Sequence, residues 1–327
     1  MHFSILSFIA IFLASISSNA LVSGFSVEPK TLGRPSSLFR KQMKPEASFD
    51  VHSSLSRSSN LPLQLSGGAN GENAPSKPTL AREMIAEFIG TFMIVQIGCG
   101  TVCAAIFKSA QVGLWQIAVV WSIAVTLAIS VTAAISGAHL NPAITVSLAM
   151  LRGFGWGKVI PFIVAQLLGA VAGAGVNFAL FREAIAGFEA SNMIVRGSLE
   201  SVQSAKAFGE YWSVSSWGTA FFAEAYGTAV LAFVIFALTN PDNETTSKYP
   251  FLIPPLIGAT VGALISVIAD LTQAGFNPAR DFGPRIIAVL AGWKGIAMKG
   301  WWLYVIAPLV GAPIGAWIAD KVLYSKK

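Results

Sequence analysis

The chain has 327 residues, of which 54% are hydrophobic and only 12% carry a charge. Soluble domains carry about twice that charged fraction, so the composition excludes an ordinary soluble protein and indicates one embedded in a bilayer. The formal net charge is +6, but residues 1–82 hold eight Lys and Arg against four Asp and Glu, which is +4 of that total. Because the excess charge lies mostly in this N-terminal stretch, we do not expect a nucleic-acid partner.

The N-terminal stretch has the pattern of a targeting sequence. Residues 5–16 form an apolar run too short to cross a bilayer, and Ser18 and Ala20 supply the small residues of a cleavage site, so we expect a signal peptide over 1–20. Residues 21–79 are rich in Ser and Pro and lack apolar periodicity, which predicts disorder. Together they resemble the two-part presequence, with a transit peptide, of proteins sent to complex algal plastids. The alternative is a signal or anchor segment with a disordered cytoplasmic tail, in a protein of the plasma membrane or an endomembrane.

Six apolar segments follow, each long enough, at about 20 residues, to cross roughly 30 Å of hydrocarbon as a helix. They lie near residues 83–107, 114–135, 158–181, 217–238, 250–270 and 301–322. Two shorter apolar stretches, 141–151 and 277–290, begin with Asn-Pro and would extend only about 15–20 Å, which is typical of re-entrant segments. We therefore predict an all-α membrane protein, with six transmembrane helices and two re-entrant half-helices in a channel domain over residues 80–324.

The two halves of this domain, about residues 83–181 and 217–323, repeat one another. Both contain the tripeptide Asn-Pro-Ala, as Asn141, Pro142 and Ala143 and again as Asn277, Pro278 and Ala279. Glu87 precedes the first tripeptide by 54 positions and Glu224 precedes the second by 53. Because each half has an odd number of spans, the second is inverted, and the two half-helices can enter from opposite faces and meet at the midplane.

An Asn-Pro pair is by itself a sound helix start, because Asn caps an N-terminus and Pro fits the first helical position. Two copies at matched positions and at membrane depth indicate more, namely a pore whose centre receives the positive ends of two helix dipoles and so repels cations and hydronium. The amides of Asn141 and Asn277 can each donate a hydrogen bond to the oxygen of a passing molecule. A water molecule held in this way interrupts a continuous proton wire.

Arg280 follows the second tripeptide directly. An arginine at membrane depth is costly, so we expect it to face a water-filled passage and to donate hydrogen bonds to solute hydroxyls. The alternative is a structural salt bridge with Asp270 or Asp281.

Three further polar residues lie near the half-helices. Glu87 and Glu224 occupy corresponding spans, and we expect them to brace the re-entrant loops by accepting backbone N–H bonds rather than to transport protons. His139 precedes the first tripeptide by two residues, and we expect it to support the loop, with pH gating as the alternative.

These motifs resemble the signatures of the major intrinsic protein family, and of its aquaglyceroporin branch in particular. Residues 136–143, Ser-Gly-Ala-His-Leu-Asn-Pro-Ala, are similar to the first signature. Residues 275–284, Gly-Phe-Asn-Pro-Ala-Arg-Asp-Phe-Gly-Pro, are similar to the second in its glycerol-facilitator form. The likeness runs from about residue 81 to residue 321 and implies a homotetramer with one pore per subunit.

The resemblance also implies roles for residues outside the tripeptides. The residues that match positions typical of glycerol-conducting members are Phe181, Asp281, Arg285, Pro308 and Leu309. The selectivity filter of the family corresponds to Trp121, Ile265, Ala274 and Arg280, a set similar to the filter of plant nodulin-26-like channels. Glycerol facilitators have Gly at the position of Ile265 and a second aromatic at that of Ala274, so the pore's width and best substrate stay open.

We therefore predict a passive channel for glycerol and other small uncharged solutes, with some water, that excludes protons and ions. One alternative is a channel mainly for water, urea or ammonia; another, of a different class, is a non-conducting structural membrane protein. An ion-coupled transporter would need acids or cation ligands where this chain has neutral Asn amides. Because the sequence has no phosphate loop, zinc spacing or nucleophile–base pattern, we expect no enzyme activity, no cofactor and no metal.

Overall fold

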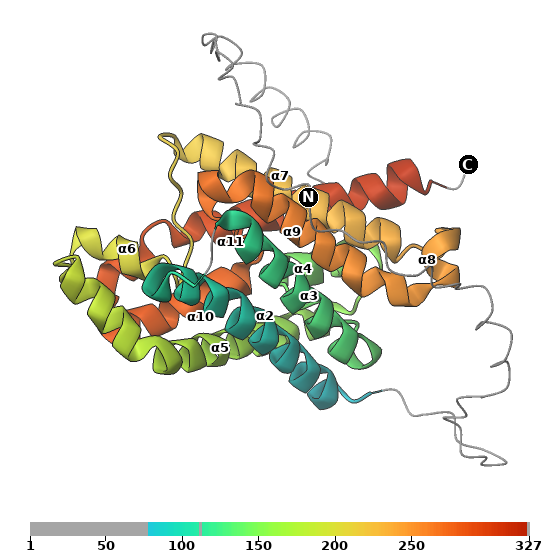
Figure 1. Ribbon diagram of the computed structural model, residues 1–327. Coiled ribbons are helices and arrows are strands. Elements are labelled where there is room, and N and C mark those ends of the chain that lie inside the picture. The colour runs from blue at the N-terminus through green and yellow to red at the C-terminus, as the bar shows by residue number, and fades with distance from the viewer. Residues whose placement is uncertain (1–77, 111–112, 326–327) are drawn as a thin grey trace, which may run out of the picture. The chain divides into compact units, whose positions relative to one another are not determined.

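A computed structural model describes residues 78–110 and 113–325, and these residues form a helical membrane domain (Figure 1). The helices that are long and apolar enough to cross a membrane are α2 (Leu80–Lys108), α3 (Leu114–Ser136), α5 (Trp156–Ser191), α7 (Trp217–Leu238), α9 (Ile253–Thr272) and α11 (Trp301–Trp317). The short helices Pro250–Leu252 and Ile318–Leu323 lengthen the last two spans. The predicted all-α architecture is confirmed, whereas the predicted signal peptide and nearly all of the predicted transit peptide lie outside the described residues.

Two shorter helices, α4 (Pro142–Leu151) and α10 (Pro278–Ala288), begin at the predicted half-helix positions. Further short helices occupy the connections, as Leu199–Ser201, α6 (Val202–Ala205), α8 (Glu244–Lys248), Val289–Trp293 and Lys294–Met298. α10 ends two residues before the predicted limit because a π-helical turn follows it, in which Gly292 has a φ of 103°. The 80–324 limits of the channel domain stay a prediction.

Helix α5 continues ten residues past its predicted end at residue 181, as far as Ser191. Hydropathy placed the end there because Arg182 and Glu183 interrupt the apolar run. The helix persists since Ile185 and Glu189 of the extension are buried against the following loop. Tertiary packing therefore sets this end of the helix, and hydropathy does not.

Small residues allow the spans of each repeat to approach closely, and in matching places. A Cβ atom at Gly169 of α5 would lie 2.2 Å from the carbonyl oxygen of Phe88 in α2. At Gly311 of α11 it would lie 1.9 Å from the carbonyl oxygen of Ala225 in α7. Such contacts are typical of helices packed in a bilayer, where van der Waals contact drives association.

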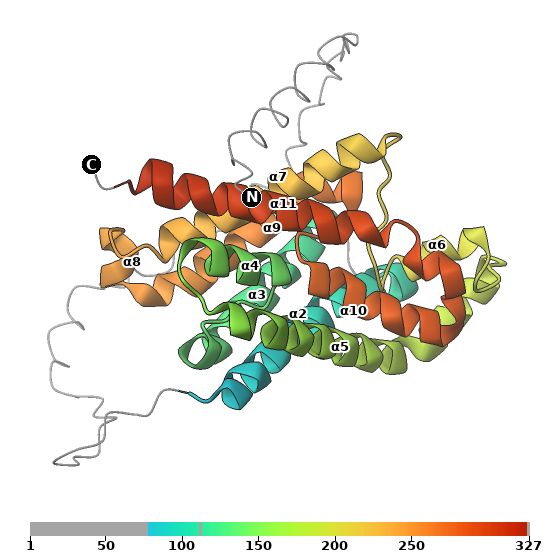
Figure 2. The same cartoon turned by 180° about the vertical axis from the view of Figure 1, so that it is seen from behind.

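Each half-helix packs against spans of the other repeat. Ala143 of α4 shares a buried cluster with Phe236 of α7 and Ala312 of α11. Gly283 of α10 lies against Ala170 of α5, so closely that a Cβ there would be 2.4 Å from the Ala170 methyl. Figure 2 shows α4 and α10 lying between α5 and α11. The repeats are thus interlocked through their half-helices.

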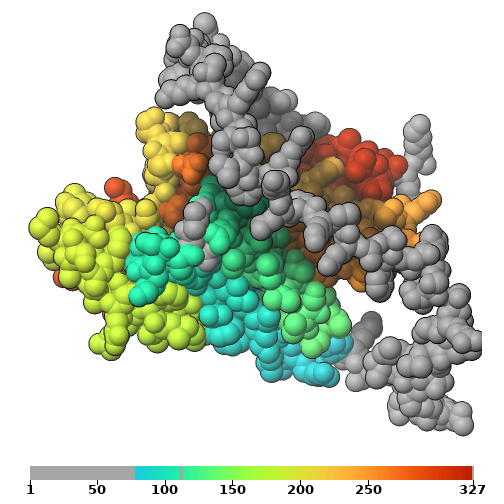
Figure 3. Space-filling view, in the orientation of Figure 1, coloured from blue at the N-terminus to red at the C-terminus, as the bar shows by residue number. Residues whose placement is uncertain are grey.

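The outer surface of the spans is apolar. Large side chains such as Ile123, Ile160, Leu168 and Val267 are at least half exposed, as expected for residues that face lipid. Figure 3 shows one face of the molecule, on which the cyan and green surface of the first repeat meets the yellow-to-red surface of the second. Both repeats therefore contribute to the outer surface of the domain.

Candidate functional site

The tips of the two half-helices meet through reciprocal hydrogen bonds. The Asn141 side chain donates through Nδ2 to the carbonyl oxygen of Phe276 at 2.9 Å. The Asn277 side chain donates through Nδ2 to the carbonyl oxygen of Leu140 at 2.8 Å. Each asparagine thus reaches across to the loop that carries the other, and the two Asn-Pro-Ala copies lie together.

The same two side chains cap their own helices. Oδ1 of Asn141 accepts the N–H of Ala143 at 2.9 Å, and Oδ1 of Asn277 accepts the N–H of Ala279 at 3.0 Å. An amide group has two N–H donors. Among the described residues only one of these donors has an acceptor, the opposite loop, so each asparagine keeps one donor there, and both residues line the same cavity.

The loops before the tips have matched, strained backbones. Ala138 and Leu140 have φ values of 51° each, and Ala274 and Phe276 have values of 60° and 54°. Non-glycine residues adopt this left-handed region rarely, and each costs about 1–3 kcal/mol that the surrounding structure must offset. The same conformation at equivalent positions of both repeats indicates that the loops share one architecture.

Two buried glutamates hold these loops. Glu87 accepts the N–H groups of His139 at 2.9 Å and Leu140 at 2.7 Å, and it also accepts bonds from Ser136 and Gln166. Both glutamate side chains are fully buried.

Glu224 makes the equivalent contacts in the second repeat. Its two carboxylate oxygens accept the N–H groups of Gly275 and Phe276, each at 2.9 Å. Each acid therefore contacts the loop at the position where a brace was expected.

A cavity of about 510 Å³ runs past the asparagines. It is lined by all four predicted filter residues, Trp121, Ile265, Ala274 and Arg280. The rest of the wall is mainly apolar and includes Ile94, Val125, Ile129, Leu231 and Ile257. The structure therefore brings Asn141, Asn277 and the four predicted filter residues to one cavity with a mainly apolar lining and a few polar groups.

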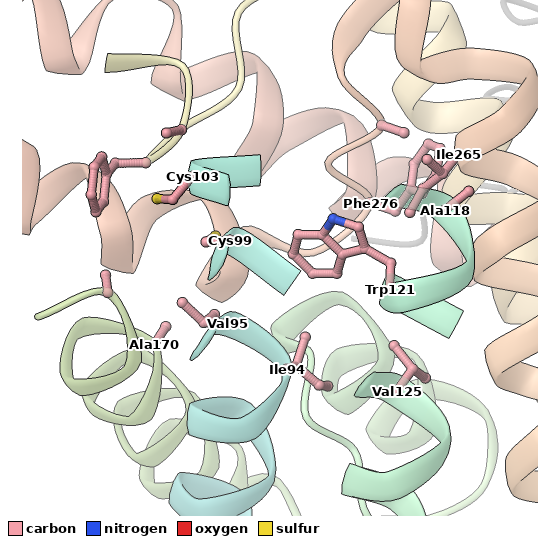
Figure 4. Close-up of a cluster of buried hydrophobic side chains, with 14 of the residues drawn as sticks. Ile94, Val95, Cys99, Cys103, Ala118, Trp121, Val125, Ala170, Ile265 and Phe276 are labelled. Atoms are coloured by element: carbon pink, nitrogen blue, oxygen red, sulfur yellow. The ribbon is translucent and has the colours of Figure 1, made fainter. Parts of the chain in front are cut away.

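Arg280, one of the predicted filter residues, is stacked and paired. The Arg280 guanidinium lies 4.3 Å from the centroid of the Trp121 ring, and it forms an ion pair with Glu210. Both charged side chains are only 6% exposed. Figure 4 shows Trp121 projecting from α3, between Cys99 of α2 and the loop that carries Phe276.

Glu210 is a residue that the sequence analysis missed. It belongs to the long connection between α5 and α7, where no periodic pattern indicates which side chain turns inward. The alternative expectation for Arg280, a salt bridge to Asp270 or Asp281, named the wrong acids, because Asp281 pairs with Arg285 at 2.8 Å.

The Asp281–Arg285 pair is fully buried and lies outside the cavity wall. It holds the backbone of Glu210 at both ends. The Asp281 carboxylate accepts the Glu210 N–H at 2.8 Å, and the Arg285 guanidinium donates to the Glu210 carbonyl oxygen. This pair therefore contacts the segment that presents a carboxylate to Arg280.

The other predicted residues divide between the cavity and its surroundings. His139 lines the cavity, with its ring 4.6 Å from that of Phe154. Phe181 lines a separate surface groove formed by the ends of α2 and α5 and is not among the residues that line the cavity. Residues buried or packed behind the cavity wall are Pro142, Ala143, Pro278, Ala279, Pro308 and Leu309.

Comparisons with known proteins point to one family. The sequence model of the family described as Major intrinsic protein matches residues 75–319. Glycerol uptake facilitator proteins of Haemophilus influenzae and Escherichia coli are 40% identical over 252 residues, which cover 75% of this chain and 95% and 89% of theirs. A propanediol uptake facilitator of Citrobacter freundii is 40% identical over 246 residues, 73% of this chain and 90% of its own. The X-ray structure of the aquaglyceroporin from Plasmodium falciparum has 28% identity and a TM-score of 0.66, covering 75% of this chain and 97% of that one.

Proposed function

The chain belongs to the major intrinsic protein family, and on that premise we propose that it is a passive transmembrane channel for glycerol and other small uncharged solutes. The family is one of channels rather than enzymes, and six apolar helices make this chain an integral membrane protein. The observation that carries the proposal is the meeting of two asparagine-capped helix tips at a cavity that also contains Trp121 and Arg280. Relatives at 40% identity are named for glycerol and propanediol uptake.

At the centre of the passage, the spare N–H groups of Asn141 and Asn277 donate to the oxygen of a solute. The half-helix N-termini place partial positive charge at the same point, which repels cations and hydronium. The apolar wall opposite the asparagines accepts the hydrocarbon side of a polyol. Orientation by two donors against an apolar wall therefore favours small molecules with hydroxyl groups on one side.

At the filter, Arg280 supplies guanidinium donors and Trp121 supplies an apolar surface. Ile265 and Ala274 complete the ring. Because Glu210 pairs with Arg280, the guanidinium acts mainly as a hydrogen-bond donor, and its net positive charge is compensated. Repulsion of cations then falls chiefly to the ends of α4 and α10.

Glu87 and Glu224 act as braces. A hydrogen bond to a charged group contributes about 1.5–3 kcal/mol, and each carboxylate makes two such bonds to backbone N–H groups. These bonds act against the strain of the left-handed residues, Ala138 and Leu140 in the first loop and Gln273, Ala274 and Phe276 in the second, at about 1–3 kcal/mol each. These acids thereby keep the loop backbones in the shape that forms the passage wall.

The test of the function is stopped-flow light scattering on proteoliposomes with water, glycerol, urea and ammonia as separate solutes. We expect glycerol to cross at a rate well above that of empty liposomes. If glycerol crosses no faster than in empty liposomes while water, urea or ammonia is conducted, the protein is instead a channel mainly for water, urea or ammonia. No conduction of any solute would leave the structural-protein alternative.

Assembly and residence are separate proposals. A homotetramer with one pore per subunit is supported by the family resemblance, and native mass spectrometry in detergent would test it by the mass of the complex. Residence in an algal plastid membrane is supported by the Ser-rich pattern after a signal-like segment. A fluorescent fusion of residues 1–80 that stays outside the plastid would refute that proposal.

A further inference from the structure

A second arginine lines the passage, at the mouth opposite the filter. Arg152 caps the C-terminus of α4, and its side chain shares the cavity wall with Leu148, Ile235, Thr239 and Ile253. These neighbours are apolar except for Thr239. The mouth is therefore a largely apolar opening with one strongly polar side chain on its wall.

The Arg152 guanidinium is fixed by four hydrogen bonds. Its Nε and Nη2 atoms donate to the two carboxylate oxygens of Asp320, at 3.0 and 2.7 Å. Nη2 also donates to the carbonyl oxygen of Phe236 at 2.6 Å, and Nη1 donates to the Thr239 hydroxyl at 2.6 Å. The group also lies 4.3 Å from the centroid of the Phe236 ring. Its position is thus set by these acceptors and by stacking on the Phe236 ring.

This arrangement leaves one donor without an acceptor among the described residues. A guanidinium has five N–H donors, and the four bonds use one on Nε, two on Nη2 and one on Nη1. The spare donor is therefore on Nη1, whose other N–H donates to the Thr239 hydroxyl. Thr239 also lines the cavity. Asp320 compensates the positive charge, so the site suits a neutral oxygen acceptor better than an anion.

We propose that Arg152 is a second solute-binding residue of the passage, which offers its Nη1 donor to the hydroxyl or carbonyl oxygen of a small neutral solute at this mouth. The inference rests on the proposed channel function. A solute that enters an apolar mouth loses hydrogen bonds to water, and a fixed donor replaces one of them. Binding there favours entry of molecules with several polar groups over entry of water alone.

The chain offers a matched control pair. Arg196 and Glu189 form an ion pair at 2.6 Å, and Arg196 lies 4.3 Å from the centroid of the Trp293 ring. The exposed fractions are 25% and 9% for this pair and 21% and 11% for Arg152 and Asp320. Neither Arg196 nor Glu189 lines the passage. The two pairs therefore differ mainly in access to the solute.

The experiment compares the ratio of glycerol to water permeability in proteoliposomes of the full chain. The test variant is Arg152→Met with Asp320→Leu, which removes both charges together and leaves no unpaired carboxylate. The control variant is Arg196→Met with Glu189→Leu. A third variant, Arg152→Gln with Asp320→Asn, keeps neutral donors at the mouth. If the Met–Leu protein does not reconstitute, Arg152→Leu with Asp320→Asn takes its place.

We expect the test variant to lower the glycerol-to-water ratio about fivefold, the size of effect that one hydrogen bond has. The control variant keeps the wild-type ratio, and the Gln–Asn variant restores most of it. An unchanged ratio in the test variant, or a lowered ratio that Gln and Asn do not restore, would overturn the inference and leave the channel function intact. A wild-type protein that conducts no glycerol would instead refute the proposed function, and the inference with it.

Discussion

The Glu210 carboxylate pairs with the Arg280 guanidinium, although 70 positions of sequence separate them. The pair forms because Asp281 and Arg285, in the same half-helix as Arg280, bind the backbone of Glu210. A residue of the long connection is thereby held beside Arg280 by the half-helix that carries this arginine. Asp281 and Arg285, which match positions typical of glycerol-conducting members, thus have a structural explanation, although neither residue lines the passage.

Replacement of Glu210 by Gln tests the role of this pair. It would leave Arg280 uncompensated in a buried site, so that the guanidinium binds solute oxygens more tightly and releases them more slowly. We expect glycerol permeability to fall by roughly tenfold, the effect of one hydrogen bond to a charged group. Glu200→Gln is the control, because Glu200 lies exposed in the same connection. Equal permeability of the two variants in stopped-flow measurements would argue against a filter role for Glu210.

Variants of the buried Asp281–Arg285 pair should show that stability can be regained without regaining glycerol conduction. Asp281→Ala leaves a buried unpaired guanidinium and should cost about 3–5 kcal/mol of stability. Asp281→Leu with Arg285→Met removes both charges and should regain most of that stability. It also releases Glu210, so its glycerol permeability should stay low. Thermal melting and flux on the same preparations check both parts; a double variant that conducts like the wild type would contradict the positioning role.

The glutamate braces predict a loss of both stability and conduction. Glu87→Gln and Glu224→Gln each keep one acceptor oxygen but present an amide N–H₂ to a backbone N–H. We expect each to cost about 1.5–3 kcal/mol for the lost charged bond, together with a large fall in glycerol flux. Melting temperatures and flux of the two variants would be compared. Normal flux in both would mean that the loops hold their shape without these acids.

Close contact between α7 and α11 predicts that Gly311 tolerates no side chain. Gly311→Ala would place a methyl 1.9 Å from the Ala225 carbonyl oxygen, so the helices must separate. Overpacking of this kind costs about 1–3 kcal/mol. Gly187→Ala is the control, because that helical position in α5 has nothing within 4 Å and alanine favours a helix there. Equal melting temperatures of the two variants would show that α7 and α11 are packed less closely at Gly311 than the structure indicates.

Most of the fold could be predicted from the sequence. The length of each apolar segment is set by the thickness of the bilayer, and the half-helix starts are set by local capping chemistry. The half-helix starts at Pro142 and Pro278 followed from capping rules, and the six spans followed from length. Glu210 was not predictable, since a long connection without periodicity does not indicate which side chain turns inward. The resemblance matched Phe181 to a position typical of glycerol-conducting members without placing its side chain, and the structure has it at a groove near the end of α5.

The most direct test of two facing asparagine-capped helix tips at one passage is an experimental structure of the full chain in lipid nanodiscs with glycerol present. We expect glycerol in one open passage, with a hydroxyl oxygen within hydrogen-bond distance of Nδ2 of both Asn141 and Asn277. Helix tips held apart, or side chains that block the passage between them with glycerol bound elsewhere, would contradict it.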